Sequence, residues 1–152
     1  MSRAFVKESE PVDELPEKLV SAHPNLVTPE GLAVIESKVA RLQVELGEAQ
    51  HADERDAIQR VSRDLRYWNA RLATAEVQPP PASTSAVSFG TTVTLERDDG
   101  RVQTFRIVGE DESDPPKGTI SYTSPLAQAL MGKSVGDVVK AGGGEAEITK
   151  IA

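Results

Sequence analysis

The sequence predicts an α+β protein: an antiparallel helical hairpin followed by a small, strongly bent antiparallel β-sheet domain with one short helix. Three observations support this. Apolar residues recur at spacings of 3 and 4 between residues 32 and 72, a proline-rich stretch follows at 78–86, and apolar residues then alternate from residue 87. Spacings of 3 and 4 are typical of packed helices, and alternation is typical of strands. We therefore expect four parts: a flexible N-terminal arm (1–27), a coiled-coil hairpin (28–77), a linker (78–86) and a sheet domain (87–152).

The hairpin begins at Thr28, which can cap a helix whose first position is Pro29. Gly47 is expected to end the first helix, and the polar stretch 48–56 is expected to form the turn. The apolar seams are Leu32, Ile35, Val39, Leu42 and Leu46 on the first helix and Ile58, Val61, Leu65, Trp68 and Leu72 on the second. Two equal seams joined by a polar turn predict an antiparallel pair with arms of roughly 18–20 residues, about 28 Å long.

The segments around the hairpin are defined by proline. Residues 1–27 contain three prolines, with three basic and five acidic groups, and this composition favours a flexible arm. Three consecutive prolines at 79–81 end the second helix and form a semi-rigid spacer. These prolines place the domain boundary at 78–86.

The sheet domain is expected to contain several short strands and one helix. Asp99-Gly100 predicts a tight hairpin turn after the first strand, and alternation continues over 102–108. A loop at 114–118 precedes a short strand at 119–122. Ser124 and Pro125 form a helix start, as cap and first position. Two final strands, at 138–140 and 146–151, are separated by three glycines at 142–144.

Composition excludes several kinds of site. The chain has 152 residues, no Cys and two His, which rules out disulfides, thiolate zinc sites and a histidine metal cage. A net charge of −7 argues against binding duplex DNA through its phosphates. No apolar run approaches the roughly 18 residues of a membrane span. We expect a cytoplasmic, monomeric protein that does not contact membranes.

Several segments, in order, resemble the GreA/GreB family of bacterial transcript-cleavage factors. Residues 27–32 (VTPEGL) resemble the opening of its hairpin, and residues 105–112 (FRIVGEDE) resemble its central strand and loop. Residues 120–133 (ISYTSPLAQALMGK), followed by Val135-Gly136-Asp137, resemble its signature stretch, and Gly143-Gly144-Glu145 resembles the turn before its last strand. The resemblance covers residues 27–152.

The resemblance implies an N-terminal coiled-coil hairpin and an FKBP-like C-terminal domain. It also implies docking on RNA polymerase beside the secondary channel, with the hairpin entering that channel. The positions expected to contact the polymerase are Ser121, Ser124, Pro125 and Leu126. Apart from this contact, they are a strand end and a helix cap. The chain would have no catalytic site and no cofactor of its own, and it would meet nascent RNA or DNA only within the elongation complex.

The hairpin tip carries four acids, Glu48, Asp53, Glu54 and Asp56. In the family, tip carboxylates help to hold a second Mg²⁺ for cleavage of backtracked RNA, so Asp53, Glu54 and Asp56 could share a Mg²⁺ with the polymerase. The acids could also form a solvated turn or a specific polymerase contact. Residues 47–57 lack the family's tip pattern, and the arms are shorter than those of cleavage-competent members. The short arms resemble the truncated hairpin of the Rnk type, which competes for the same site without cleaving RNA.

Two other readings remain open. Arg60, Arg63 and Arg66, with Arg71, lie on the second helix and could guide RNA or contact polymerase acids, or they could form a mixed, solvated helix face. An FKBP-like fold alone could also host a prolyl isomerase or a general binding module, because fold does not fix function. That reading needs an aromatic-lined pocket, and Phe89, Phe105 and Tyr122 are the domain's only aromatic residues.

Overall fold

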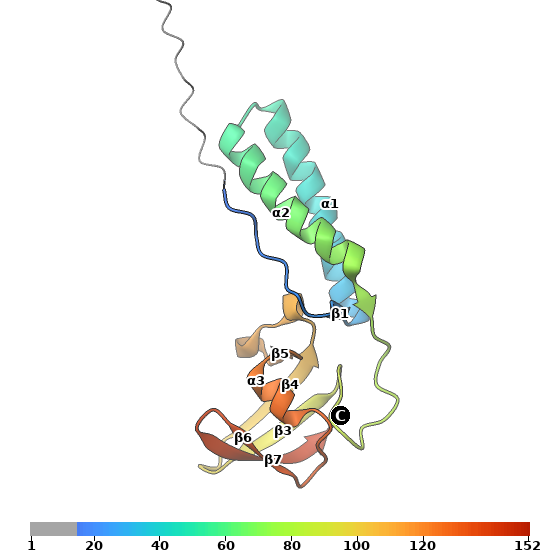
Figure 1. Cartoon of the computed structure of the whole chain (residues 1–152), viewed down its shortest axis with the longest axis vertical. Helices are drawn as coiled ribbons and strands as arrows, with labels where there is room; N and C mark the ends of the chain where they lie inside the picture. The colour runs from blue at the N-terminus through green and yellow to red at the C-terminus, as the bar shows by residue number, and fades with distance from the viewer. Residues whose placement is uncertain (1–14) are drawn as a thin grey trace, which may run out of the picture.

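The computed structural model describes residues 15–152, in which a helical hairpin projects from a small curled β-sheet domain (Figure 1). The hairpin comprises α1 (Pro29–His51) and α2 (Arg55–Thr74). The sheet domain comprises β3 (Thr92–Arg97), β4 (Val102–Val108), β5 (Thr119–Ser121), α3 (Pro125–Leu130), β6 (Val138–Ala141) and β7 (Gly144–Ile151). The predicted α+β class, with a hairpin before a sheet, is confirmed. The finer FKBP-like likeness stays a prediction.

The hairpin packs through the predicted seam. Ile35, Val39 and Leu42 of α1 are buried, as is Val61 of α2. Thr28 caps α1, since its hydroxyl oxygen accepts a hydrogen bond from the Gly31 backbone N–H at 3.0 Å. This cap satisfies one of the amides that every helix start leaves without a partner.

The first helix is longer than expected. Gly47 does not end it, because α1 continues through Gly47 to His51. A glycine inside a helix costs about 1 kcal/mol relative to alanine, and the continued helix buries Ala49, which is 7% exposed. The turn is therefore confined to residues 52–54, where Asp53 adopts a left-handed conformation with φ of 53°.

The chain enters and leaves the hairpin through a short strand pair that periodicity did not reveal. β1 (Leu26–Val27) pairs in parallel with β2 (Glu76–Val77). Val27 is 1% exposed, and Asn25 and Thr28 beside it are also buried. The end of the expected flexible arm is thus built into the fold. Residues 1–14 of that arm lie outside the described residues.

The sheet has the strand order β5-β4-β3-β7-β6 and is not wholly antiparallel as expected. β5 runs parallel to β4, while the other neighbouring pairs are antiparallel. The cause is the connection after β4: it contains two 3₁₀ turns, η1 (Glu110–Glu112) and η2 (Pro115–Lys117), and returns the chain in the original direction. A two-residue turn could join only antiparallel strands. The alternation at 87–91 also gives no strand, since Ser88 and Thr91 close a turn there.

The core of the domain lies where α3 covers the curled sheet. Leu95, Ile107 and Ile148 from the sheet are fully buried, as is Leu130 from α3. η1 follows β4 and contacts β5 and β1, so it lies at one end of the sheet, next to the base of the hairpin (Figure 1). Within residues 15–152, no helix has the length and apolar character needed to cross a membrane.

Candidate functional site

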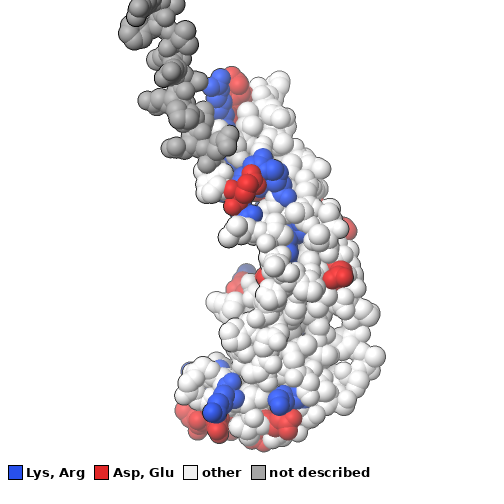
Figure 2. Space-filling model, viewed as in Figure 1, with Lys and Arg blue, Asp and Glu red and all other residues white. Residues whose placement is uncertain are grey.

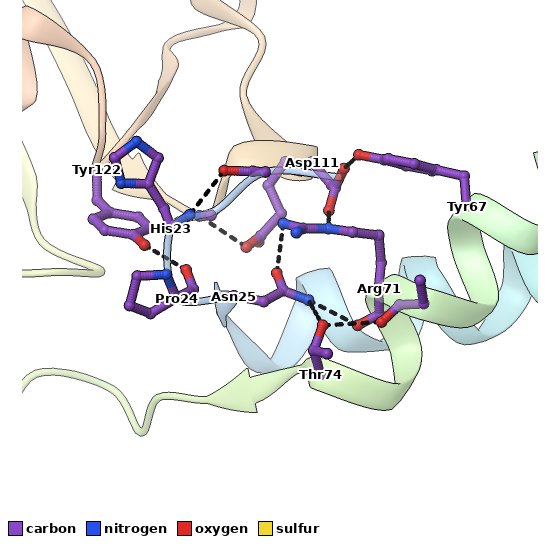
Figure 3. Close-up of polar contacts among 12 residues, drawn as sticks. His23, Pro24, Asn25, Tyr67, Arg71, Thr74, Asp111 and Tyr122 are labelled. Atoms are coloured by element: carbon purple, nitrogen blue, oxygen red, sulfur yellow. Dashed lines mark hydrogen bonds and ion pairs between the residues drawn. The ribbon is translucent and has the colours of Figure 1, made fainter. Parts of the chain in front are cut away.

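The hairpin is joined to the sheet domain by two neighbouring acids of η1, Asp111 and Glu112. Asp111 contacts the end of α2, and Glu112 contacts the start of α1. Both ends of the hairpin are therefore held by one turn of the sheet domain. We call these contacts, together with Asn25, Thr28, Tyr67 and Arg71, the junction. Figure 3 shows the part of it around Arg71.

Arg71 is the centre of the α2 half of the junction (Figure 3). Its side chain is 2% exposed, and its Nε lies 2.5 Å from Asp111 Oδ2. Its Nη2 donates to Asn25 Oδ1 at 2.7 Å, and Asn25 Nδ2 in turn donates to the Arg71 carbonyl at 2.7 Å. A buried charge is tolerated only when it is paired and hydrogen-bonded. The sequence suggested either a contact of Arg71 with RNA or polymerase acids or a place on a solvated helix face, and the structure corrects both, because Arg71 is buried and paired within the chain.

Tyr67 adds a third group to the same ion pair. Its hydroxyl donates a hydrogen bond to Asp111 Oδ1, so both carboxylate oxygens of Asp111 are occupied. Burial raises the pKa of Tyr67 to about 12, and the hydrogen bond to the Asp111 carboxylate acts in the same direction. Tyr67 therefore stays protonated and keeps donating across the ordinary pH range.

Glu112 is the centre of the α1 half. Its Oε2 accepts hydrogen bonds from the backbone N–H groups of Thr28 and Gly109, each at 3.1 Å, and its Oε1 accepts from the Thr28 hydroxyl. A carboxylate at this place also complements the positive end of α1. The approach is so close that a Cβ on Gly31 would lie 2.2 Å from the Glu112 carboxyl carbon, and one on Gly109 would lie 2.3 Å from the Leu26 carbonyl oxygen. At Gly109 the obstacle is backbone, so glycine is required there, whereas at Gly31 the obstacle is the end of the Glu112 side chain.

The tip of the hairpin is organised differently. Glu48 lies in the last turns of α1, Asp53 and Glu54 lie in the turn, and Asp56 lies in the first turn of α2. All four side chains are exposed. The structure thus brings the predicted acids to one end of the hairpin without burying any of them.

The tip does not form a metal site by itself. Among residues 15–152, no group of three or more His, Cys, Asp or Glu side chains is arranged to hold a metal ion. Mg²⁺ commonly takes only one or two protein carboxylates and completes its shell with water and phosphate. The tip carboxylates fit such a role only as single oxygen ligands offered to a site on another molecule.

The predicted docking residues lie around α3. A pocket of 350 Å³ is lined by Ile120, Ser124, Pro125 and Leu126, together with the cations Arg97 and Lys140. Ser124 caps α3 by accepting from the Ala127 N–H at 3.3 Å, and Pro125 at the first helical position is exposed. Ser121 does not line this pocket; its hydroxyl lies 2.7 Å from that of Thr123. Three of the four predicted residues therefore share one surface.

The predicted arginines of α2 lie beside residues 15–20, an extended segment that we call the strap. Arg66 pairs with Glu17 of the strap, with 2.5 Å between Nη2 and Oε1. Lys18 of the strap pairs with Asp64 at 2.8 Å. Arg63 Nε lies 3.5 Å from Asp64 Oδ1, and Arg60 is exposed. The face carrying these arginines is thus partly covered by the chain itself.

Sequence reasoning missed most of the junction. Asp111 and Glu112 were noted only as part of a family-like segment, and Asn25 was placed in a flexible arm. One signal was available: a buried arginine needs a carboxylate, and three consecutive acids, at 110–112, follow the buried end of β4. The partners are 40 residues apart in the chain for Arg71 and Asp111, so no local pattern connects them.

Comparison with known proteins identifies the sheet domain. Residues 82–152 match the family model described as the C-terminal domain of the transcription elongation factors GreA and GreB. The chain is 43% identical over 88 residues to transcription elongation factor GreA of Alkalilimnicola ehrlichii, covering 55% of this chain and 56% of that protein. It is 46% identical over 81 residues to transcription elongation factor GreB of Neisseria meningitidis serogroup B, covering 52% and 50%.

Among solved structures, the chain is similar to GreA factor homolog 1 of Thermus thermophilus, with 21% identity, a TM-score of 0.43, and coverage of 86% of this chain and 99% of that one. The chain matches about half the length of its curated relatives. The family match and the curated identities together lead to one conclusion. The C-terminal domain of this chain belongs to the GreA/GreB family of transcription elongation factors.

Proposed function

We propose that the chain binds bacterial RNA polymerase as an elongation regulator of the GreA/GreB type. Its C-terminal domain would dock beside the secondary channel and direct the hairpin into it. The observation that carries this proposal is the family match over residues 82–152, supported by identities of 43% and 46% to a GreA and a GreB. We expect a monomer that has no catalysis of its own and acts on the polymerase.

The docking surface proposed is the α3 pocket, with Ser121 beside it. Its chemistry suits a protein partner, because apolar groups from Ile120, Pro125 and Leu126 adjoin the cations Arg97 and Lys140. An apolar centre with charged groups around it is typical of protein interfaces. The partner surface should therefore present an apolar side chain flanked by carboxylates.

The hairpin supports two modes of action. Its acids Glu48, Asp53, Glu54 and Asp56 are exposed at the tip, so they could reach a metal ion held by the polymerase and stimulate RNA cleavage. The Rnk-like mode is occupancy of the channel without cleavage. It is favoured by the arm lengths of 23 and 20 residues, which give a reach of only about 30–35 Å. Both modes use the same docking surface.

A binding assay tests the docking. Immobilised core polymerase should retain the chain, and Pro125→Ala should weaken retention because it removes an exposed contact of the pocket. Ser124→Asp should also weaken it, while keeping an oxygen that can cap α3. Val102→Thr, at a residue that is 66% exposed on β4, is the matched surface control. Unchanged retention of both pocket variants would contradict docking through α3.

A transcript-cleavage assay on a backtracked elongation complex separates the two modes. The test variant is Asp53→Asn/Glu54→Gln/Asp56→Asn, which removes the tip charges with little change in shape. Shortened RNA that is lost in this variant would establish stimulation of cleavage. Inhibition of an added GreA, retained in the variant, would establish competition. If neither effect occurs and the polymerase is not bound, the elongation reading fails and a binding module or isomerase becomes the next hypothesis.

A further inference from the structure

Two ion pairs hold the strap on α2. In one pair the strap supplies the carboxylate, and in the other it supplies the ammonium. Glu17 is held by the Arg66 side chain at two points, 2.5 Å from Nη2 and 3.1 Å from Nε. Lys18 lies 2.8 Å from Asp64 and its ammonium lies 5.8 Å from the centre of the Tyr67 ring. Because consecutive strap residues carry opposite charges that pair with opposite charges on α2, the register of the strap is fixed. Figure 1 shows the strap running beside α2.

The attachment of the strap is mainly ionic. Leu19 is 94% exposed and Val20 is 49% exposed, so both lie largely in solvent, whereas Leu15, 38% exposed, lines a pocket with Ile58 of α2. Among the described residues, no backbone hydrogen bond joins residues 15–20 to α2. Exposed ion pairs contribute at most about 1 kcal/mol and are screened by salt. Another molecule can therefore displace the strap without unfolding anything.

The surface under the strap is a basic helix in an acidic protein. α2 contains five arginines and two aspartates, whereas α1 contains four glutamates against one lysine and one arginine. The whole chain has a net charge of −7. Figure 2 shows basic and acidic atoms lying together on the hairpin half of the molecule, separated from those of the sheet end by uncharged surface.

The carboxylate that Arg66 binds in this structure indicates which kind of ligand the surface recognises. The two-point contact of Glu17 with Nε and Nη2 is the fork geometry by which arginine binds carboxylates. Because the Glu17 carboxylate already fills this fork, we infer that the ligand of the surface is a carboxylate.

We propose that the α2 face around Arg63 and Arg66 binds an acidic segment of another protein, and that the strap covers this face in cis through Glu17. The strap thus competes with the partner segment for the α2 face. Because it is tethered to the same chain, its effective concentration at this face is in the millimolar range, as for other short linkers. A partner segment with several carboxylates displaces it by engaging more cations than Glu17 can. This surface lies on α2, and it does not depend on docking through α3.

The test uses the full chain and a fluorescent peptide with the sequence of residues 13–20, DELPEKLV. Glu17→Gln weakens the cover, so the peptide should bind this variant about two- to fivefold more tightly than the wild type. In the double variant Glu17→Gln/Arg66→Gln, this increase in peptide affinity should be lost, and added salt should reduce it. Glu45→Gln and Arg41→Gln are the matched controls, because they make the same changes in an exposed pair on α1. They should leave peptide binding unchanged.

The strap itself can be followed with one label, because the chain contains no Cys. A spin label on Leu19→Cys should be restricted in the wild-type background and mobile with Glu17→Gln. Equal mobility in both would overturn the cover. Equal peptide affinity for the wild type and Glu17→Gln, or affinity independent of Arg66, would overturn the carboxylate site. Arg66-dependent binding of an oligouridylate in place of the peptide would overturn the choice of an acidic protein partner.

Discussion

The two ends of the hairpin carry similar side chains but use them differently. At the base, Asp111 and Glu112 each have several hydrogen-bond partners, and Arg71 is buried among them. At the tip, Asp53 and Glu54 are exposed in the turn. The half-buried acids at the base hold both helices to the sheet domain through hydrogen bonds and an ion pair, and the exposed acids at the tip remain available to other molecules. In this molecule, bonding to the rest of the fold distinguishes a structural acid from a candidate functional one.

The largest effect should come from breaking the buried ion pair. Arg71→Met leaves Asp111 without its cation, and a buried charge that loses its partner costs about 3–5 kcal/mol. Urea unfolding should show this loss in the free energy of unfolding. The double variant Arg71→Met/Asp111→Leu should recover most of it, because no charge remains uncompensated. A double variant as unstable as the single one would mean that packing, and not the charge, governs this site.

The next effect distinguishes two glycines of similar appearance. Gly109→Ala places a Cβ 2.3 Å from the Leu26 carbonyl oxygen, so backbone must move, at a cost of about 1–3 kcal/mol. Gly47→Ala meets nothing within 4 Å and lies inside α1, so it should stabilise the protein by up to about 1 kcal/mol. Urea unfolding should show a lower free energy of unfolding for Gly109→Ala and a higher one for Gly47→Ala. Changes of the same sign in both variants would contradict the close approach at the junction.

A smaller effect is expected at high pH. The pKa of Tyr67 is raised to about 12, above its ordinary value of 10.0. A group with a raised pKa contributes stability that is complete below its unfolded pKa and is lost as the pH rises toward the folded one. The stability difference between wild type and Tyr67→Phe should therefore shrink between about pH 10 and 12. A difference that is constant over this window would exclude Tyr67 ionisation as its cause.

The smallest effect belongs to the tip. Glu54→Gln together with Asp56→Asn should change the free energy of unfolding by less than about 0.5 kcal/mol, because both side chains are exposed. Thermal unfolding of the double variant checks this. A loss above 1 kcal/mol would show that the tip acids support the turn, and their availability to another molecule would then be in doubt.

The sequence predicted the parts of the fold that periodicity and caps determine. Spacings of 3 and 4 identified both helices, and the Thr28 and Ser124 caps located two helix starts. The end of α1 was placed too early, because Gly47 was taken as a stop although burial of Ala49 and the helix bonds outweigh its cost.

The features that could not be predicted depend on contacts between distant residues. The pairing of Leu26–Val27 with Glu76–Val77 involves strands too short to show alternation. The parallel course of β5 depends on how η1 and η2 redirect the chain. The roles of the α3 residues and of the tip acids stay predictions. The strap contacts and the junction could not be predicted, because their partners are far apart in the chain.

The strand pair at the base has a consequence for how such a hairpin can change. Because Leu26–Val27 and Glu76–Val77 lie side by side, the chain enters and leaves the hairpin at a single point. Adding or deleting one heptad in each arm near the turn would alter the reach by about 10 Å and leave every contact at that point intact. The length of the hairpin can therefore change independently of the contacts that hold its base to the sheet domain.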